Sequence, residues 1–305
     1  MSLTTAMMNF CSRHLAVLLG SICTCLGSVH ATELVALSDA SGDDCRSAPP
    51  RGAITLCTEH IEKLEKKGSD QSRGSKEYAS QLYAAYIQRG ISFGRLAEYQ
   101  SAVADFNSAI GIKPDGGSAY ANRGVAHRLQ GAFEKSIEDF GKAIILEPEN
   151  PNHFANRGIS NYKAKWVGRA FEDLEKAVEL SPAPYFLTTL AWHRYLSGNV
   201  VAAKELSDRS IAQGKSYLSS VTHAHILAAL GEEKLAYREF VIAANLGGFQ
   251  KVREMQKSLH RLGLVRARFN EALFMSGDLD DETKDGLWKC ALERCRLLDR
   301  VAEWK

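Results

Sequence analysis

Between residues 83 and 184 the chain alternates apolar and polar positions with helical spacing. Apolar residues recur three and four positions apart in two blocks, and a short turn separates the blocks. This is the pattern of two amphipathic helices joined as a hairpin. It occurs three times at a spacing of 34 residues, in 83–116, 117–150 and 151–184. The pattern therefore predicts three consecutive helical hairpins of equal length.

Six columns of residues stay in register when the three units are laid over one another. The glycine column lies inside the first predicted helix, where glycine costs about 1 kcal/mol relative to alanine. We therefore expect each glycine to permit close approach of the second helix, with the small residues of that helix opposite it. The columns are Tyr86, Tyr120 and Phe154; Gly90, Gly124 and Gly158; Ala102, Ser136 and Ala170; Phe106, Phe140 and Leu174; Ala109, Ala143 and Ala177; and Pro114, Pro148 and Pro182.

The period, the glycine and the closing proline together resemble the tetratricopeptide repeat. The resemblance implies an all-α fold, a solenoid of helical hairpins, with a small C-terminal helical domain after it. It is specific over residues 83–184. Two divergent repeats are expected over 185–248, where Gly198 and Gly231 keep the glycine signal. Residues 32–82 are expected to form a degenerate leading hairpin and a linker.

A second pair of columns departs from the family's usual pattern. An arginine precedes each glycine, where the family usually has an apolar residue, and an aspartate follows sixteen residues later. We interpret these as ion pairs joining first and second helices, within one repeat or between neighbours. A ladder of anion-binding arginines along the groove is the alternative. The residues are Arg89, Arg123 and Arg157 with Asp105, Asp139 and Asp173.

The resemblance also implies a concave groove lined by the first helices, which takes a protein or peptide partner. Asn122 and Asn156 match a position that grips a terminal carboxylate in some relatives, but Ile87 and Ile91 replace the lysines that complete that clamp. The groove is apolar with a basic margin, so an acidic segment with an apolar anchor fits it better. Part of the surface could instead be covered by the ends of the array. The groove residues expected are Ile87, Ile91, Arg95, Val125, Arg128, Ile159, Tyr162 and Lys163.

The N-terminus carries an apolar run, Leu15 to Val29, that follows Arg13 and ends before a small-x-small site. This run is too short to span a bilayer comfortably and is typical of a secretory signal peptide. We expect residues 1–31 to be removed after Ala31 and the chain to be periplasmic. Contact with a membrane is expected only through this segment before cleavage; an uncleaved anchor is the alternative.

Export would place the cysteines in an oxidising compartment, where disulfide bonds form. Cys45, Cys57, Cys290 and Cys295 remain after residue 31, and an oxidising compartment favours two disulfide bonds. Four cysteines allow three pairings, of which the local one, Cys45 with Cys57 and Cys290 with Cys295, closes the shortest loops. A zinc site is disfavoured because neither pair has knuckle spacing or a completing histidine.

The stretch from 249 to 305 is similar to the small three-helix peptidoglycan-binding domain. The similarity rests on apolar positions from Val252 to Leu262, on Gln256 and on Thr283, but Ser276 and Asp280 depart from the family's loop. Two roles stay open for these residues, glycan binding and capping of the solenoid. The first would make the protein a module attached to the cell wall.

Charge and composition exclude other functions. A formal net charge of +2 opposes a nucleic-acid surface, which needs a basic stripe. The histidines are scattered along predicted helices, and His223 and His225 lie on different faces of one helix, which is wrong for a shared metal. We find no phosphate loop after a strand. The sequence therefore predicts a non-catalytic scaffold without metal or cofactor.

Overall fold

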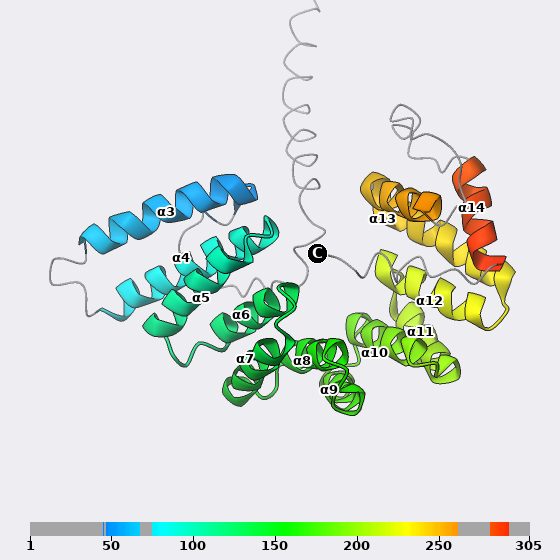
Figure 1. Ribbon diagram of the computed structural model, residues 1–305, viewed down its shortest axis with the longest axis horizontal. Coiled ribbons are helices and arrows are strands. Elements are labelled where there is room, and N and C mark those ends of the chain that lie inside the picture. Colours follow the sequence, from blue (N-terminus) through cyan, green and yellow to red (C-terminus); the bar gives the residue numbers. More distant parts are fainter. Residues whose placement is uncertain (1–44, 46, 68–74, 262–280, 293–305) are drawn as a thin grey trace, which may run out of the picture. The chain divides into compact units, whose positions relative to one another are not determined.

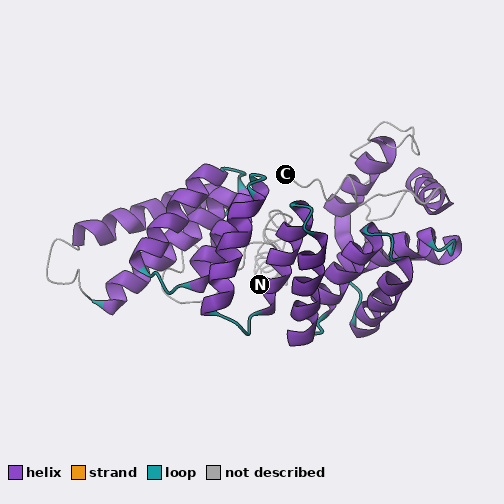
Figure 2. Ribbon diagram, turned by 60° about the horizontal axis from the view of Figure 1, so that its bottom comes forward, coloured by secondary structure: helices purple, strands orange, loops and turns teal. Residues whose placement is uncertain are grey.

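The computed structural model describes residue 45 and residues 47–67, 75–261 and 281–292. Within these ranges every regular element is a helix, and no strand occurs (Figure 2). The chain divides into two compact units, Met1–Pro148 and Glu149–Lys305. Within each unit consecutive helices pack as hairpins, which confirms the all-α, helical-hairpin fold (Figure 1). The division falls between the second and third repeats.

The first unit contains one leading helix and two hairpins. Helix α3 (Pro50–Lys67) packs against α4 (Lys76–Arg95), which pairs with α5 (Tyr99–Ile112); α6 (Gly117–Leu129) pairs with α7 (Phe133–Leu146). The core between the hairpins contains the fully buried rings of Phe106 and Phe140. Burial of one such ring stabilises the fold by roughly 1.5–3 kcal/mol. The column that contains Phe106 and Phe140 therefore belongs to the core.

The second unit contains three hairpins and an added helix. Helix α8 (Pro151–Lys163) pairs with α9 (Val167–Leu180), and α10 (Pro184–Leu196) with α11 (Val200–Gln213). Helix α12 (Tyr217–Ala229) pairs with α13 (Glu233–Arg261), and α14 (Asp281–Leu292) packs on α13. Helix α13 is broken at Gly248, where φ is 66° and ψ is −177°.

Local signals explain where several helices begin. Pro151 and Pro184 occupy the first turns of α8 and α10, where a missing amide hydrogen leaves no helical bond unmade. Asn150 caps α8 by accepting a hydrogen bond from the Asn152 amide at 3.1 Å. Ser216 and Ser219 cap α12 reciprocally.

The turn inside each hairpin has one residue in the left-handed region. Glycine fills this place in three hairpins because it carries no Cβ. Two hairpins use a residue with a side chain at the same place, Ala97 at φ 61° and Lys165 at φ 68°. The sequence analysis missed this column, although glycines at one spacing mark it. The glycines are Gly131, Gly198 and Gly231.

The C-terminal helices share a core with the last hairpin. Leu287 and Cys290 of α14 lie in one buried cluster with Val221 of α12, Phe240 of α13 and Met255 beyond its break. Ten consecutive residues of α12, 219–228, are buried, so this helix is covered on all its faces. The part of α13 beyond its break and α14 thus complete the packing of α12. Of the helices described, none combines the length and apolar character that crossing a bilayer requires.

Candidate functional site

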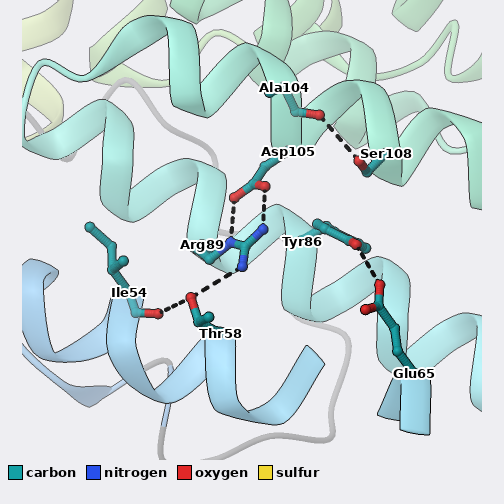
Figure 3. A network of polar contacts seen from close by, with 8 residues as sticks. All are labelled: Ile54, Thr58, Glu65, Tyr86, Arg89, Ala104, Asp105 and Ser108. Atoms are coloured by element: carbon teal, nitrogen blue, oxygen red, sulfur yellow. Dashed lines mark hydrogen bonds and ion pairs between the residues drawn. The ribbon is translucent and has the colours of Figure 1, made fainter. Parts of the chain in front are cut away.

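Arg89 and Asp105 form a two-point ion pair between the helices of one hairpin (Figure 3). Arg89 Nε donates to Asp105 Oδ2 at 2.8 Å and Nη2 donates to Oδ1 at 2.7 Å. The remaining nitrogen, Nη1, donates to Thr58 Oγ1 at 3.1 Å, and that hydroxyl donates to the Ile54 carbonyl. The guanidinium therefore ties α3, α4 and α5 together.

The same pair recurs in the next two repeats. Arg123 binds Asp139 at 2.9 and 2.6 Å, and Arg157 binds Asp173 at 2.9 and 2.7 Å. Arg123 also donates to Asn107 of the preceding hairpin at 2.6 Å. Fork-to-fork pairing of this kind is the strongest geometry available to the two side chains. The ion-pair interpretation is confirmed within each repeat. The aspartate carboxylates already accept the guanidinium hydrogen bonds that an anion-binding ladder would need.

Burial and charge both strengthen these pairs. The aspartate side chains are 4 to 8% exposed, whereas the arginines are 18 to 28% exposed. The hydrogen bonds that Arg89 and Arg123 donate to their aspartates raise the pKa of both arginines, and burial opposes that rise. Because the carboxylates are shielded from water, each pair is a structural contact that holds a hairpin closed.

An aromatic residue lies beneath each arginine. The Cζ atoms of Arg89 and Arg123 lie 5.4 and 5.5 Å from the ring centroids of Tyr86 and Tyr120. Arg157 stands 5.8 Å from the ring of Phe154. These distances are within the range of cation–π attraction. The aromatic and arginine columns are three residues apart, so helical spacing alone could have indicated the contact.

In the first two repeats the glycine accommodates an aromatic ring rather than the small residue opposite. A Cβ on Gly90 would lie 2.6 Å from Phe106 Cε1, and one on Gly124 would lie 3.0 Å from Phe140 Cε2. The prediction of close approach is therefore confirmed, but the contacting group is corrected in these two repeats. In the third repeat the smaller Leu174 lets the helices come closer, and the Ala170 carbonyl lies 3.0 Å from the same point on Gly158.

The groove residues of the first unit are largely covered. The sequence places Ile91 and Val125 in the groove, whereas the structure buries them in the core at 2% and 1% exposure. They interlock the hairpins and present no surface to a partner, which corrects the prediction. Arg128 is buried as well, and Ile87 packs on the same core. Arg95 is half-buried and its Nε has no hydrogen-bond partner; burial lowers its pKa.

The groove residues of the second unit retain surface. Ile159 lies partly buried on the cluster formed by α8, α9 and α10. Tyr162 is also half-buried, and its ring meets His193 of α10 edge-on with centroids 4.8 Å apart. Lys163 is exposed at the end of α8. Helical spacing puts Ile159, Tyr162 and Lys163 on one side of α8, and the buried His193 lies beside Tyr162. We call these four residues the α8–α10 face, which combines apolar, aromatic and cationic groups.

His223 occupies a polar network that resembles a catalytic arrangement. Its Nδ1 lies 2.9 Å from Ser207 Oγ, and its Nε2 lies 3.7 Å from Asp208. Ser207 donates its proton to the Lys204 carbonyl at 3.0 Å, so the imidazole must donate to the serine. A general base has to accept that proton instead. Since Ser207 is also buried, the network is structural.

The neighbouring His225 faces another part of the second unit. It lies among aromatic rings, 5.2 Å from Phe240 and 5.7 Å from Trp192 between centroids. The two histidines therefore point to different surroundings, in agreement with the helical spacing. Within the described ranges, no three His, Cys, Asp or Glu side chains are grouped so that they could hold a metal ion.

The structure joins the first cysteine pair. Cys45 and Cys57 form a disulfide bond with Cα atoms 5.4 Å apart, which fixes the chain before α3 to that helix. Cys290 is buried in α14, whereas Cys295 lies outside the described residues, so that pairing stays a prediction. The signal peptide and its cleavage site also lie outside the described residues.

Two residues of the C-terminal resemblance bind each other. The Gln256 amide donates to Thr283 Oγ1 at 2.6 Å, and both side chains are buried. They hold α13 and α14 together. Ser276 and Asp280, where the sequence departs from the peptidoglycan-binding pattern, lie outside the described residues.

The chain is similar to several proteins of known structure. Several solved structures of tetratricopeptide proteins are similar, and no curated protein matches the chain. One, from Parabacteroides merdae, is 16% identical, with 65% of this chain and 87% of that one covered and a TM-score of 0.48. Two more are PilF of Pseudomonas aeruginosa (18% identical, 63% and 90% covered, TM-score 0.45) and the second such domain of human RPAP3 with an HSP70 peptide (22% identical, 38% and 98% covered, TM-score 0.36).

Identities this low leave the binding specificity to the residues of this chain. The family comparison is local: the model of the tetratricopeptide repeat matches residues 117–150. That segment is the hairpin α6–α7, with Gly124 against Phe140 and Arg123 bound to Asp139. Residues 117–150 are thus a tetratricopeptide repeat, set among helical hairpins built with the same contacts.

Proposed function

We propose that the protein is a non-catalytic, exported scaffold that binds a polypeptide partner on the α8–α10 face. The observation that carries this proposal is that most repeated residues make structural contacts between helices, whereas a few residues of α8 do not. The Arg–Asp pairs and the glycine–aromatic contacts hold the helices, and Tyr162 and Lys163 take part in neither. Their side chains keep exposed surface next to His193.

The chemistry of this face selects a type of partner. Ile159 and the Tyr162 ring offer apolar surface, and the Lys163 ammonium offers a cation at its margin. An apolar anchor buries area on the first two, while an acidic residue beside it pairs with the lysine. The proposed ligand is therefore an extended or helical segment with one apolar anchor flanked by acidic residues.

Binding to an array of short peptides tests this directly. The array varies the apolar anchor and the number of flanking acidic residues, and the full chain is the probe. We expect Tyr162→Ala to weaken binding to all anchored peptides and Lys163→Glu to remove the preference for acidic flanks. Arg209→Glu, an exposed charge change on α11, is the matched control. Equal binding by all three variants and the parent chain would refute the site.

Export is the second part of the proposal. It is supported by the apolar run before Ala31 and by the Cys45–Cys57 bond, which persists in oxidising compartments. Mass measurement of the protein recovered from the periplasm tests it. A chain beginning at Thr32 is expected, and recovery of an intact N-terminus from the cytoplasm would contradict export.

Attachment to the cell wall stays a prediction, and sedimentation with peptidoglycan sacculi tests it. Deletion of residues 249–305 is a poor control because Met255 and Leu287 belong to the core around α12. Competition by soluble peptidoglycan fragments leaves that core intact. Retention on sacculi that such fragments abolish would support attachment, and absence of retention would leave capping as the role of these helices.

A further inference from the structure

The turn between α8 and α9 exposes apolar and basic side chains together. All five residues from Lys165 to Arg169 are exposed. Trp166 and Val167 are each 40% exposed, although large apolar side chains normally bury their surface. The corresponding position to Trp166 in the second repeat is Ala132. The third repeat therefore carries an exposed tryptophan that the hairpin fold does not require.

The segment around this turn is basic. No acidic residue occurs from Pro151 to Phe171. Arg157 in this stretch is paired with Asp173, but within the described part of the chain Lys165 and Arg169 make no ion pair. The guanidinium of Arg169 lies over the Trp166 ring with Cζ 5.0 Å from the centroid. Arg169 is thus held over the exposed indole, and Lys165 adds a second basic residue next to Trp166 in the chain.

The framework of the repeat holds Trp166 in this exposed position. Its amide donates to the Asn161 carbonyl at 2.8 Å, and the Asn161 side chain donates to Asp173 at 2.9 Å. Lys165 adopts a left-handed conformation, for which three other hairpins use glycine. Strained residues of this kind are concentrated at functional sites, where the side chain matters more than the local conformation.

We propose that this turn, defined as the basic tip (Lys165, Trp166, Val167 and Arg169), docks on the surface of an anionic lipid bilayer. We favour a bilayer over a peptide because five consecutive residues of one turn are exposed together, whereas a peptide needs a groove. Tryptophan prefers the headgroup level of a membrane, and lysine and arginine are attracted to anionic headgroups. The tip would place the scaffold at a membrane surface after the signal peptide has left.

This inference differs from the expectation drawn from the sequence, which limits membrane contact to residues 1–31. It is also independent of the α8–α10 face, since none of the four tip residues belongs to that face. Variants of Tyr162 and Lys163 therefore test the peptide site, and variants of the tip test lipid binding. Failure of either proposal leaves the other standing.

Flotation with lipid vesicles tests the basic tip. The chain is assayed with and without residues 1–31, so that the apolar N-terminal run is separated from the tip. Vesicles with about a third phosphatidylglycerol are compared with pure phosphatidylcholine. We expect Arg169→Gln to weaken binding to the anionic vesicles about fivefold, in line with the attraction of one basic residue. Trp166→Ala should weaken it at least as much, and added salt should screen it.

Lys165→Gly separates a role in binding from a role in folding. Glycine relieves the left-handed conformation, so this variant should melt at a higher temperature while binding anionic vesicles about fivefold more weakly. Lys234→Glu, an exposed charge change on α13, is the matched control and should change neither. Equal binding to both kinds of vesicle, equal binding by the tip variants, or binding to a soluble poly-glutamate peptide without binding to vesicles would each overturn the proposal.

Discussion

Arg123 on α6 and Asp139 on α7 are joined by two parallel hydrogen bonds, Nε to Oδ2 at 2.9 Å and Nη2 to Oδ1 at 2.6 Å. The aspartate side chain is 4% exposed, and the arginine reaches on to Asn107 of the preceding hairpin at 2.6 Å. One guanidinium therefore closes its own hairpin and attaches it to the one before. Substitution of either residue therefore tests how much this pair contributes to the stability of the repeats.

We predict that Asp139→Asn lowers the free energy of unfolding by roughly 2–4 kcal/mol. Removal of one partner from a buried pair costs about 3–5 kcal/mol, and partial exposure of the arginine reduces that figure. Urea melts followed by circular dichroism measure the change. The matched control is Glu138→Gln, whose side chain is 68% exposed and pairs with Lys142 on the surface. A loss no larger than that of the control would mean that the pair contributes little.

Two glycines of the first unit should respond to alanine with opposite signs. Gly90→Ala introduces a methyl group 2.6 Å from Phe106 Cε1, so we expect destabilisation by about 1–3 kcal/mol. Gly111 lies inside α5 with no atom within 4 Å of its Cβ position, so Gly111→Ala should stabilise by up to about 1 kcal/mol. Thermal melts of both variants decide the matter. Stabilisation by Gly90→Ala would contradict the packing described.

The hairpin turns allow a third prediction. Ala97 has a φ of 61°, a conformation in which a Cβ costs about 1 kcal/mol. We expect Ala97→Gly to raise the melting temperature and Gly131→Ala, at the same place in the next hairpin, to lower it. Opposite shifts in the two variants would show that the left-handed turn is kept in solution. Shifts of the same sign would contradict it.

The Cys45–Cys57 bond should stabilise the docking of α3. The bond closes a short loop, for which the chain-entropy model gives about 3 kcal/mol. We expect reduction, or the variant Cys57→Ser, to increase hydrogen exchange in α3 more than in α6. Mass measurement after alkylation without reductant checks that the bond exists. Two alkylated cysteines at these positions in protein from the periplasm would contradict it.

His223 should make the second unit sensitive to acid. Burial lowers its pKa below the ordinary value of 6.5 and is the largest effect; Lys204 and Lys215 act in the same direction, while Asp208 and Glu239 oppose it. The unfolded chain therefore binds the proton more readily than the folded one between the lowered pKa and 6.5. Stability is complete above that ordinary value and is lost as the pH falls through this window.

Melting temperatures measured from about pH 8 to pH 5 test this sign. The decline toward acid should be smaller in His223→Gln, which cannot take up the proton. Parallel profiles for the two proteins would assign the decline to other groups. Comparison of the two proteins therefore isolates the contribution of the histidine.

Much of the framework could be predicted from the sequence. A spacing of sixteen residues, repeated every 34, puts Arg123 and Asp139 on the two helices of one hairpin, and the ion pair follows once that hairpin forms. Gly124 likewise indicates that the two helices of its hairpin pack closely. These features repeat, and repetition turns a weak local signal into a strong one. The sequence analysis still missed the aromatic ring beneath each arginine, because it treated the columns separately.

The functional surface was less predictable. Ile91, Val125 and Ile159 occupy one column, yet the first two are core and the third keeps some surface. Their exposure depends on which neighbouring hairpin covers each of them. Trp166 was missed for a related reason, since the pattern gives no sign of whether an aromatic residue at a turn is covered or exposed.

The sequence by itself determined the helical hairpins, their turns and the residues that clamp them, because these depend on periodicity and on contacts that recur at one spacing. Only the tertiary structure decided which side chains remain in contact with solvent. That difference is physical: exposure of Val125 or Trp166 is set by non-local packing against other helices of the same unit, and no local stretch of sequence contains that information.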